Sequence, residues 1–264
     1  MRTALTIAGS DSGAGAGIQA DLKTFSAHGV YGTSAITAIT AQNTLALSDT
    51  VVLTPKIVTA QIKAVVEDFQ VDAIKTGMLS TYQIVKTVAT IVAKLNIKNV
   101  VVDPVMLAKT GNRLLDDDAV VAIKENLLPY AAVVTPNAVE AAVLAEITVS
   151  SLESAREAAR RIHALGPTTV VVKGGHLDTP EAIDLLYDGK EFTEFAGPRL
   201  TCTNTHGTGC TLASAIATGI AQGLGLERAA ARAQAYVQAA IAQAPGLGAG
   251  HGPIWHGHTV QAFE

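Results

Sequence analysis

Short apolar runs alternate along the chain with longer segments in which apolar residues recur every three or four positions. The first kind of pattern predicts buried β-strands, and the second predicts amphipathic α-helices. The expected strands are residues 5–8, 35–40, 73–75, 100–102, 132–134 and 169–172. The expected helices are residues 18–28, 55–69, 81–95, 116–126, a segment opened by Pro136, 152–165, 210–222 and 227–244. This alternation predicts an α/β fold with a central, mostly parallel sheet.

The pattern changes in the last third of the chain. Residues 183–187 and 191–195 are β-type runs separated by Asp188-Gly189, and an Asp-Gly pair in this position predicts a tight hairpin. We therefore expect a few antiparallel strands at an edge of the sheet. The Gly-rich tail, residues 246–258, predicts irregular structure. Because no linker, repeat or low-complexity segment divides the sequence, we expect residues 1–264 to form a single domain.

Composition and charge exclude several classes of partner. Hydrophobic residues make up 48% of the 264 residues and aromatic residues only 4%, so aliphatic side chains must build the core. The net charge is −4 and no run of Lys or Arg is present, which argues against binding nucleic acid or an acidic membrane. The N-terminus leads directly into a strand pattern, so no signal peptide fits there. No apolar run reaches the length of about 18 residues that a membrane span needs. We expect a soluble, cytoplasmic protein.

Residues suited to ligand binding gather where the predicted strands end. They are Asp11, Gln42, Met78, Asp103, Asn137 and Lys173. In open parallel sheets, the carboxyl ends of the strands line the ligand crevice. We therefore expect these side chains to meet around one site.

The segment of residues 203–211 is the strongest candidate for catalysis. Gly207 and Gly209 flank Thr208, and a helical run of small residues follows. A Gly-rich helix entry directs free N–H groups and the helix dipole at one point, so we predict an anion hole for phosphate. Cys210 would lie in the first helical turn, where the same field lowers the pKa of a thiol, and we predict that it is the catalytic base. The alternative is a Gly-containing helix entry with a buried cysteine.

The first glycine loop, residues 9–17, does not match a nucleotide-binding motif. Its glycines lack the G-x-G-x-x-G spacing, and no Gly-Lys-Ser/Thr of a P-loop follows. Gly9 and its neighbours still permit a small ligand to approach the backbone closely. Asp21, in the following helix, has two interpretations, a ligand contact or a solvated helix charge.

Gln42 and Met78 are candidates for the wall of a ligand pocket. A glutamine amide offers one acceptor and two donors, so Gln42 can pair with an aminopyrimidine-like edge. The alternative is an amide that caps a loop. Met78 can form a flexible apolar wall or simply fill the core.

Charged groups at two further strand ends suit phosphate chemistry. Asn137 and Glu140 have the spacing of a capping box, and Glu140 could equally be a carboxylate placed where phosphates meet Mg²⁺. Lys173 precedes two glycines, so it could contact a phosphate or extend to solvent. The two cysteines and the histidines lack the paired spacing of a zinc site.

Taken together, these motifs closely resemble the hydroxymethylpyrimidine/phosphomethylpyrimidine kinases of thiamine biosynthesis, a family of the ribokinase-like superfamily. The resemblance runs in order from residue 4 to beyond residue 211. Its matching segments are residues 4–11, 16–24, 41–44, 75–79, 103–106, 135–137 with Glu140-Ala141, 173–176 and 204–211. One departure is Ala14, which stands where the family often has glycine.

The resemblance implies a three-layer sandwich with helices on both faces of the sheet, and an activity. The implied reaction moves the γ-phosphoryl group of ATP, with Mg²⁺, to the hydroxymethyl group of an aminopyrimidine and then to the resulting monophosphate. The implied roles are pyrimidine binding by Gly9, Asp21, Gln42 and Met78, metal organisation by Asp103 and Glu140, ATP binding by Lys173, Thr208 and Asn137, an anion hole at Gly207, Thr208 and Gly209, and a base at Cys210.

Two other functions stay open at this point. A pyridoxal kinase of the same superfamily can share the Gly-Thr-Gly-Cys loop, although Gln42 and Met78 favour an aminopyrimidine. A ligand-binding relative without catalysis is the other alternative, and the intact set of Asp103, Glu140, Lys173 and Cys210 argues against it. The resemblance also implies a homodimer that acts on a small molecule.

Overall fold

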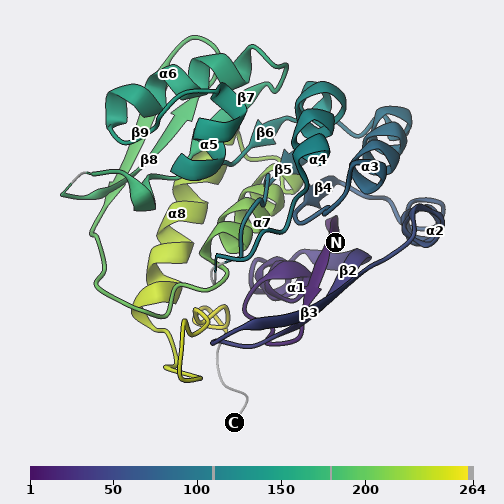
Figure 1. Ribbon diagram of the computed structural model, residues 1–264, viewed down its shortest axis with the longest axis horizontal. Helices are drawn as coiled ribbons and strands as arrows, with labels where there is room; N and C mark the ends of the chain where they lie inside the picture. Colours follow the sequence, from purple (N-terminus) through teal and green to yellow (C-terminus); the bar gives the residue numbers. More distant parts are fainter. Residues whose placement is uncertain (109–110, 179, 261–264) are drawn as a thin grey trace.

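The computed structural model describes residues 1–108, 111–178 and 180–260, and these ranges contain one nine-stranded sheet (Figure 1). The strand order is β3-β2-β1-β4-β5-β6-β7-β8-β9. Strands β2, β1, β4, β5, β6 and β7 pair in parallel, whereas β3, β8 and β9 are antiparallel. The strands are β1 (Thr3–Asp11), β2 (Tyr31–Gln42), β3 (Leu47–Val52), β4 (Ala73–Thr76), β5 (Val100–Val102), β6 (Val133–Val134), β7 (Thr169–Val172), β8 (Ala182–Tyr187) and β9 (Phe192–Gly197).

Helices cover both faces of this sheet. On one face lie α2 (Pro55–Val66), α3 (Tyr82–Leu95), α4 (Asp117–Ala122), α5 (Ala138–Ala145) and α6 (Leu152–His163). On the other face lie α1 (Gly17–Ala27), α7 (Thr208–Ala221) and α8 (Leu226–Ala242). A π-helix, Ile123–Leu127, and a 3₁₀ turn, Leu128–Tyr130, follow α4, and a further 3₁₀ turn spans Gly174–His176. The three-layer α/β prediction is confirmed.

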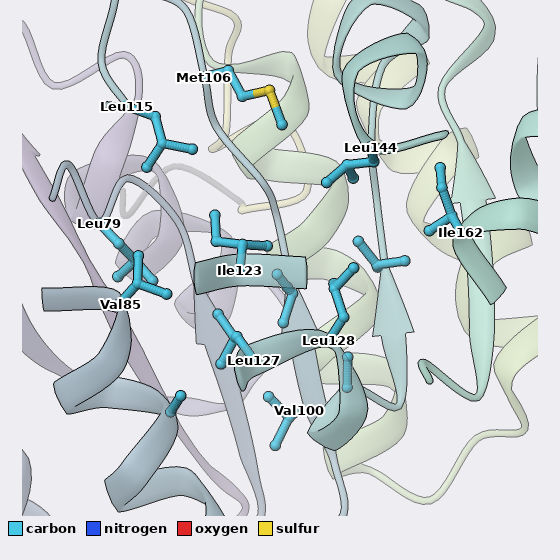
Figure 2. Close-up of a cluster of buried hydrophobic side chains, with 14 of the residues drawn as sticks. Leu79, Val85, Val100, Met106, Leu115, Ile123, Leu127, Leu128, Leu144 and Ile162 are labelled. Carbon is cyan, nitrogen blue, oxygen red and sulfur yellow. The ribbon is translucent and has the colours of Figure 1, made fainter. Parts of the chain in front are cut away.

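Two apolar clusters hold the layers together. The first lies between the sheet and helices α2 to α6, where Leu79, Val85, Ile123, Leu127 and Leu144 point toward one another (Figure 2). The second lies beneath α1, α7 and α8 and is richer in alanine. Neighbouring residues of a central strand belong to different clusters, because successive side chains of a strand point to opposite faces of the sheet. Val101 belongs to the second cluster, while Val100 and Val102 belong to the first.

Local signals in the sequence explain where several helices begin. The side chains of Thr54 and Thr81 accept hydrogen bonds from backbone N–H groups three residues on, and so cap α2 and α3. Ser151 begins α6 with a capping box. The predicted helix over residues 116–126 instead changes to π-helix after Ala122, just before Pro129 removes a backbone donor.

Strand β3 is the element that the apolar pattern missed. Its sequence is mixed, and most of its side chains are exposed at the edge of the sheet. The hairpin of β8 and β9 was predicted correctly, and Gly189 there has a φ of +93°. No helix in the described part of the chain is long and apolar enough to cross a membrane.

Candidate active site

A cavity of about 660 Å³ opens at the carboxyl ends of the parallel strands. It spans the point between β1 and β4 where the strand order reverses, which is where open α/β sheets bind ligands. Most of the predicted site residues line it. These are Gly9, Gln42, Met78, Asp103, Asn137, Glu140, Lys173, Gly207, Thr208, Gly209 and Cys210.

Asp11 organises the first glycine loop from the end of β1. Its carboxylate accepts hydrogen bonds from the backbone N–H groups of Gly13 (2.9 Å), Gly15 (3.1 Å) and Ala16 (2.9 Å). Burial alone would raise the pKa of Asp11, but these bonds and His206 lower it below its usual value. The loop is therefore built around a carboxylate anion.

His206 connects this loop to the anion-hole segment, and it is a site residue that the sequence did not reveal. Its Nε2 lies 2.8 Å from Asp11 Oδ2 and 3.3 Å from Nε2 of Gln42. The residue is buried and lines the cavity. The spacing of the histidines gives no sign of this role, because Asp11, the partner of His206, is 195 positions away. Its place directly before Gly207 was the available signal.

The predicted anion hole is the N-terminus of α7. Gly207 is the N-cap with a φ of +85°, and a Cβ atom there would lie 1.7 Å from the carbonyl oxygen of Gly15. Only glycine fits this contact. Among the described residues, no hydrogen-bond acceptor contacts the backbone N–H of Gly209 or of Cys210. Both groups are free to bind an anion, as the first turn of a helix allows.

Cys210 lines the cavity, but its predicted electrostatic state is wrong. The pKa of the thiol is raised to about 12, mainly by burial and further by the carboxylates of Asp103 and Asp21. The positive charge of Lys75 and the N–H of Gly17 counteract it only in part. Desolvation therefore outweighs the helix N-terminus that we expected to lower the pKa. The thiol carries its proton at neutral pH in this structure.

Asp103, Glu140 and Lys173 meet beside the anion hole. The Nζ atom of Lys173 lies 2.8 Å from Asp103 Oδ1 and 3.6 Å from Glu140 Oε2. Burial would lower the pKa of Lys173, but the two carboxylates raise it above its usual value. Burial raises the pKa of Glu140, and the negative charge of Asp103 acts in the same direction. A Cβ atom on Gly209 would lie 3.1 Å from Lys173 Nζ, so glycine keeps the ammonium close to the helix N-terminus.

The capping-box interpretation of Asn137 and Glu140 holds in the structure. Asn137 Oδ1 accepts from the N–H of Glu140 at 3.0 Å, and Glu140 Oε2 accepts from the N–H of Asn137 at 2.7 Å. These two bonds form the capping box of α5. Because Glu140 also faces Lys173 in the cavity, the cap fixes the position of a charged cavity residue.

Two carboxylates form the donor set that could hold Mg²⁺. Within the described ranges, no group of three or more His, Cys, Asp or Glu side chains could enclose a metal ion. Mg²⁺ is usually held by one or two carboxylates together with substrate phosphates and waters. Asp103 and Glu140, which already share one cation in Lys173, therefore fit this ion.

The structure corrects the prediction for Asp21. Its side chain is fully buried beneath the cavity and is absent from the cavity wall. Its carboxylate binds Lys75 and accepts from two hydroxyl groups of the core. Gly9 and Met78 do lie together in the wall, since a Cβ atom on Gly9 would lie 3.0 Å from Met78 Sδ.

Similarity to solved structures defines the class of protein. A Bacillus subtilis pyridoxal kinase, solved as an ADP complex, superposes with a TM-score of 0.91 at 38% identity, covering 97% of this chain and 98% of its own. With its three-layer fold and its anion hole, the chain is a small-molecule kinase of the ribokinase-like class.

Sequence comparison then gives the family. The family model described as phosphomethylpyrimidine kinase matches residues 11–255, and the chain belongs to this family. A hydroxymethylpyrimidine/phosphomethylpyrimidine kinase of Bacillus subtilis is 45% identical over 96% of this chain and 94% of its own length. A thiamine biosynthesis bifunctional protein of Geobacter sulfurreducens is 51% identical over 96% of this chain. The chain spans about half (51%) of that longer protein.

Proposed function

We propose that the protein transfers the γ-phosphoryl group of ATP to the hydroxymethyl group of 4-amino-5-hydroxymethyl-2-methylpyrimidine, and then phosphorylates the monophosphate to the diphosphate. The observation that carries this proposal is the geometry of one cavity. Its wall has a polar amide and an apolar thioether, Gln42 and Met78, and its far side has the free N–H groups of Gly209 and Cys210 facing Lys173. The name of the Bacillus subtilis relative supports the same substrate, and the name of the Geobacter sulfurreducens relative supports a place in thiamine biosynthesis.

In this proposal, residues 1–264 act as one domain, and each group has a role in binding or charge stabilisation. Gln42 pairs with the amino edge of the pyrimidine, while Gly9 and Met78 contact the ring. Lys173, Thr208 and Asn137 bind ATP. Phosphoryl transfer depends mainly on positioning and on stabilising charge on the transferred oxygens. Within the predicted anion hole of Gly207, Thr208 and Gly209, the N–H of Thr208 donates to the carbonyl oxygen of Thr205, so the N–H groups of Gly209 and Cys210 with Lys173 supply that stabilisation.

Cys210 contacts the substrate hydroxyl in this proposal. The base role stays a prediction, because the thiol is protonated in this structure. Asp103 and Glu140 would hold Mg²⁺, which when bound neutralises charge on the phosphates.

A pyridoxal kinase is the second candidate, because pyridoxal kinases are the structural relatives that superpose at a TM-score of 0.91. We place it second because the family model and the relatives of the sequence name the pyrimidine. A non-catalytic binding protein has less support, since Asp103, Glu140, Lys173 and Cys210 all converge on the cavity.

A product-resolved phosphorylation assay tests the proposal. The pyrimidine alcohol, its monophosphate and pyridoxal are offered separately with ATP and Mg²⁺, and products are separated by chromatography. We expect both pyrimidines to be phosphorylated. Turnover of pyridoxal alone would establish the second candidate, and no turnover of any acceptor would favour a binding protein.

We further propose that the protein is a homodimer and acts in the cytoplasm, where its proposed donor ATP is available. Exposed apolar side chains where β2 pairs with the edge strand β3 support the dimer: Ile39, Val51 and Val52 are 51%, 58% and 39% exposed. An apolar surface on a sheet edge is a typical protein contact. Light scattering should give twice the mass of the 27.2 kDa chain. A monomer at micromolar concentration would contradict this part.

A further inference from the structure

A fully buried ion pair lies beneath the floor of the cavity. The Nζ atom of Lys75, on β4, lies 2.8 and 2.9 Å from the two carboxylate oxygens of Asp21, on α1. Both side chains have an exposed fraction of 0%. Neither residue lines the cavity, and neither has a place in the proposed reaction.

Two hydroxyl groups complete this network and attach it to the helix of the anion hole. Thr6 Oγ1, on β1, donates to Asp21 Oδ2 at 2.6 Å, and Ser214 Oγ, on α7, donates to Asp21 Oδ1 at 2.6 Å. Ser214 comes four positions after Cys210, so the two residues lie on the same face of α7, one turn apart. The network therefore joins two strands and α1 to the first turns of α7.

Stability alone does not explain why charges are buried here. Removing two ions from water costs several kcal/mol each, and an apolar pair of similar volume is often as stable or more so. The surrounding chain is nevertheless shaped for the ammonium group, because a Cβ atom on Gly77 would lie only 2.9 Å from Lys75 Nζ.

The two charges of the pair act unequally on the thiol of Cys210. Asp21 is the only hydrogen-bond acceptor in contact with the three-donor ammonium group among residues 1–108, 111–178 and 180–260. Burial has the largest effect on the pKa of Cys210 and raises it, whereas Lys75 lowers it by more than Asp21 raises it. The charge of Lys75 lowers the pKa of Cys210 and the charges of Asp103 and Asp21 raise it, and a second cation, Lys173, also interacts with the thiol from the cavity side.

We propose that Lys75, held by Asp21, is a positioning residue for phosphoryl transfer. It fixes the first turns of α7 through Ser214 and keeps a positive charge behind Cys210, so that the anion hole is favourable to developing negative charge. The inference rests on the proposed function. It implies that the rate of transfer depends on two residues that do not touch a substrate.

The test compares two variants with the wild-type protein, all in a Cys202→Ser background. Lys75→Met removes the cation, and Asp21→Asn/Lys75→Met removes both charges while leaving an amide for Thr6 and Ser214. Lys124→Met, which breaks an ion pair with Glu146 far from the cavity, is the matched control. The measurements are kcat, KM for both substrates, Tm, and the rate at which iodoacetamide alkylates Cys210.

We expect the double variant to keep a Tm near that of the wild type, because the uncompensated carboxylate is gone. Its kcat should fall by about 10²-fold, the scale of losing one electrostatic stabiliser, with both KM values changed by less than about threefold. Alkylation of Cys210 should slow by about tenfold or more, since a nearby positive charge favours the thiolate. The Lys124→Met control should match the wild type.

Wild-type kcat and alkylation in the double variant would overturn the inference and leave the pair a structural feature. Should Lys75→Met alone fail to fold, the double variant still decides between the two results. If the wild-type protein phosphorylates no pyrimidine, the proposed function fails. The alkylation rate then decides whether Lys75 acts on Cys210.

Discussion

Single residues set the charge in this cavity, and their effects depend on neighbours distant in sequence. Gln42, Met78, Asp103 and Lys173 were predicted because each follows a strand, and parallel strands end at one edge of a sheet. Asp21 could not be placed correctly, because its partner Lys75 is 54 positions away and nothing in a helix pattern indicates it. The prediction that the pKa of Cys210 is lowered was wrong for a similar reason, because the burial that raises it is a property of the folded chain.

Replacing the thiol is the direct test of Cys210. We expect Cys210→Ala to lower kcat by about 10²-fold or more, the usual contribution of a proton-transfer group. Steady-state kinetics with the pyrimidine alcohol measures it. Cys202→Ser is the matched control, because Cys202 is half-buried outside the cavity wall. A loss below about tenfold would make Cys210 a packing residue.

Replacing the amide tests the recognition of the pyrimidine. We expect Gln42→Leu to raise KM for the pyrimidine by about tenfold, the cost of one buried hydrogen bond left unmade, and to leave KM for ATP almost unchanged. Gln42 lies beside His206 at the end of β2. Equal losses for both substrates would mean that Gln42 supports the scaffold.

Elements with local signals were predicted more accurately than elements without them. The capping box at Asn137 and Glu140 and the Asp188-Gly189 hairpin each depend on adjacent residues, and both are present. Strand β3 has no local apolar run, because pairing with β2 is what makes it a strand. Sequence patterns therefore predict an element reliably only when its own residues specify it, and they miss an element that pairing with another strand creates.

The N-terminus of α7 should tolerate no side chain at Gly207. In Gly207→Ala, the added methyl group would collide with the backbone of Gly15 at a positive φ. We expect a stability loss of about 1–3 kcal/mol and a fall in kcat of at least about tenfold from the displaced donors. Gly223→Ala, whose φ of +86° is similar and whose Cβ would meet no atom within 4 Å, isolates the backbone cost. Identical kinetics in the two variants would contradict this role.

The C-terminal tail contacts the same helix through His256, which gives a pH-dependent stability. His256 Nε2 lies 2.9 Å from Thr211 Oγ1, and burial lowers the pKa of His256 from 6.5 to about 4. The unfolded chain therefore takes up a proton before the folded one does. Stability is complete above about pH 6.5 and is lost as the pH falls toward 4.

Thermal unfolding across this range measures that effect. Between pH 7 and 4.5, the free energy of unfolding of the wild-type protein should fall by up to about 3 kcal/mol more than that of His256→Gln, because each unit of pKa difference contributes about 1.36 kcal/mol. Glutamine keeps a donor toward Thr211 but does not titrate. Parallel pH curves for the two proteins would show that another group, such as the buried His28, controls the acid transition.

At the scale of the molecule, the layers could be predicted and the strand order could not. Alternating strands and helices specify helices on both faces of a parallel sheet, but sequence does not state which strands are neighbours. The order places β1 between β2 and β4 and so creates the crevice. The site residues meet because the strands that carry them end at this edge of the sheet, as their strand-end positions predicted.

One face of the sheet is covered largely by α7 and α8, within residues 208–242. Helices α7 and α8 cover Ala73, Val101 and Val133 on that face. We expect a fragment of residues 1–200 to expose this apolar surface, to bind the dye ANS and to be digested by proteases far faster than the full chain. A fragment as resistant as the full chain would contradict this expectation.

The same arrangement has a consequence for synthesis in the cell. Residues 208–242 follow β9 along the chain, so until they are made the growing chain carries the part of the apolar sheet face that α7 and α8 cover in the folded protein. Chaperones that hold nascent chains would find their binding surface on this face. The anion hole is the first turn of α7, so the site is assembled only after residues 208–242 have been made.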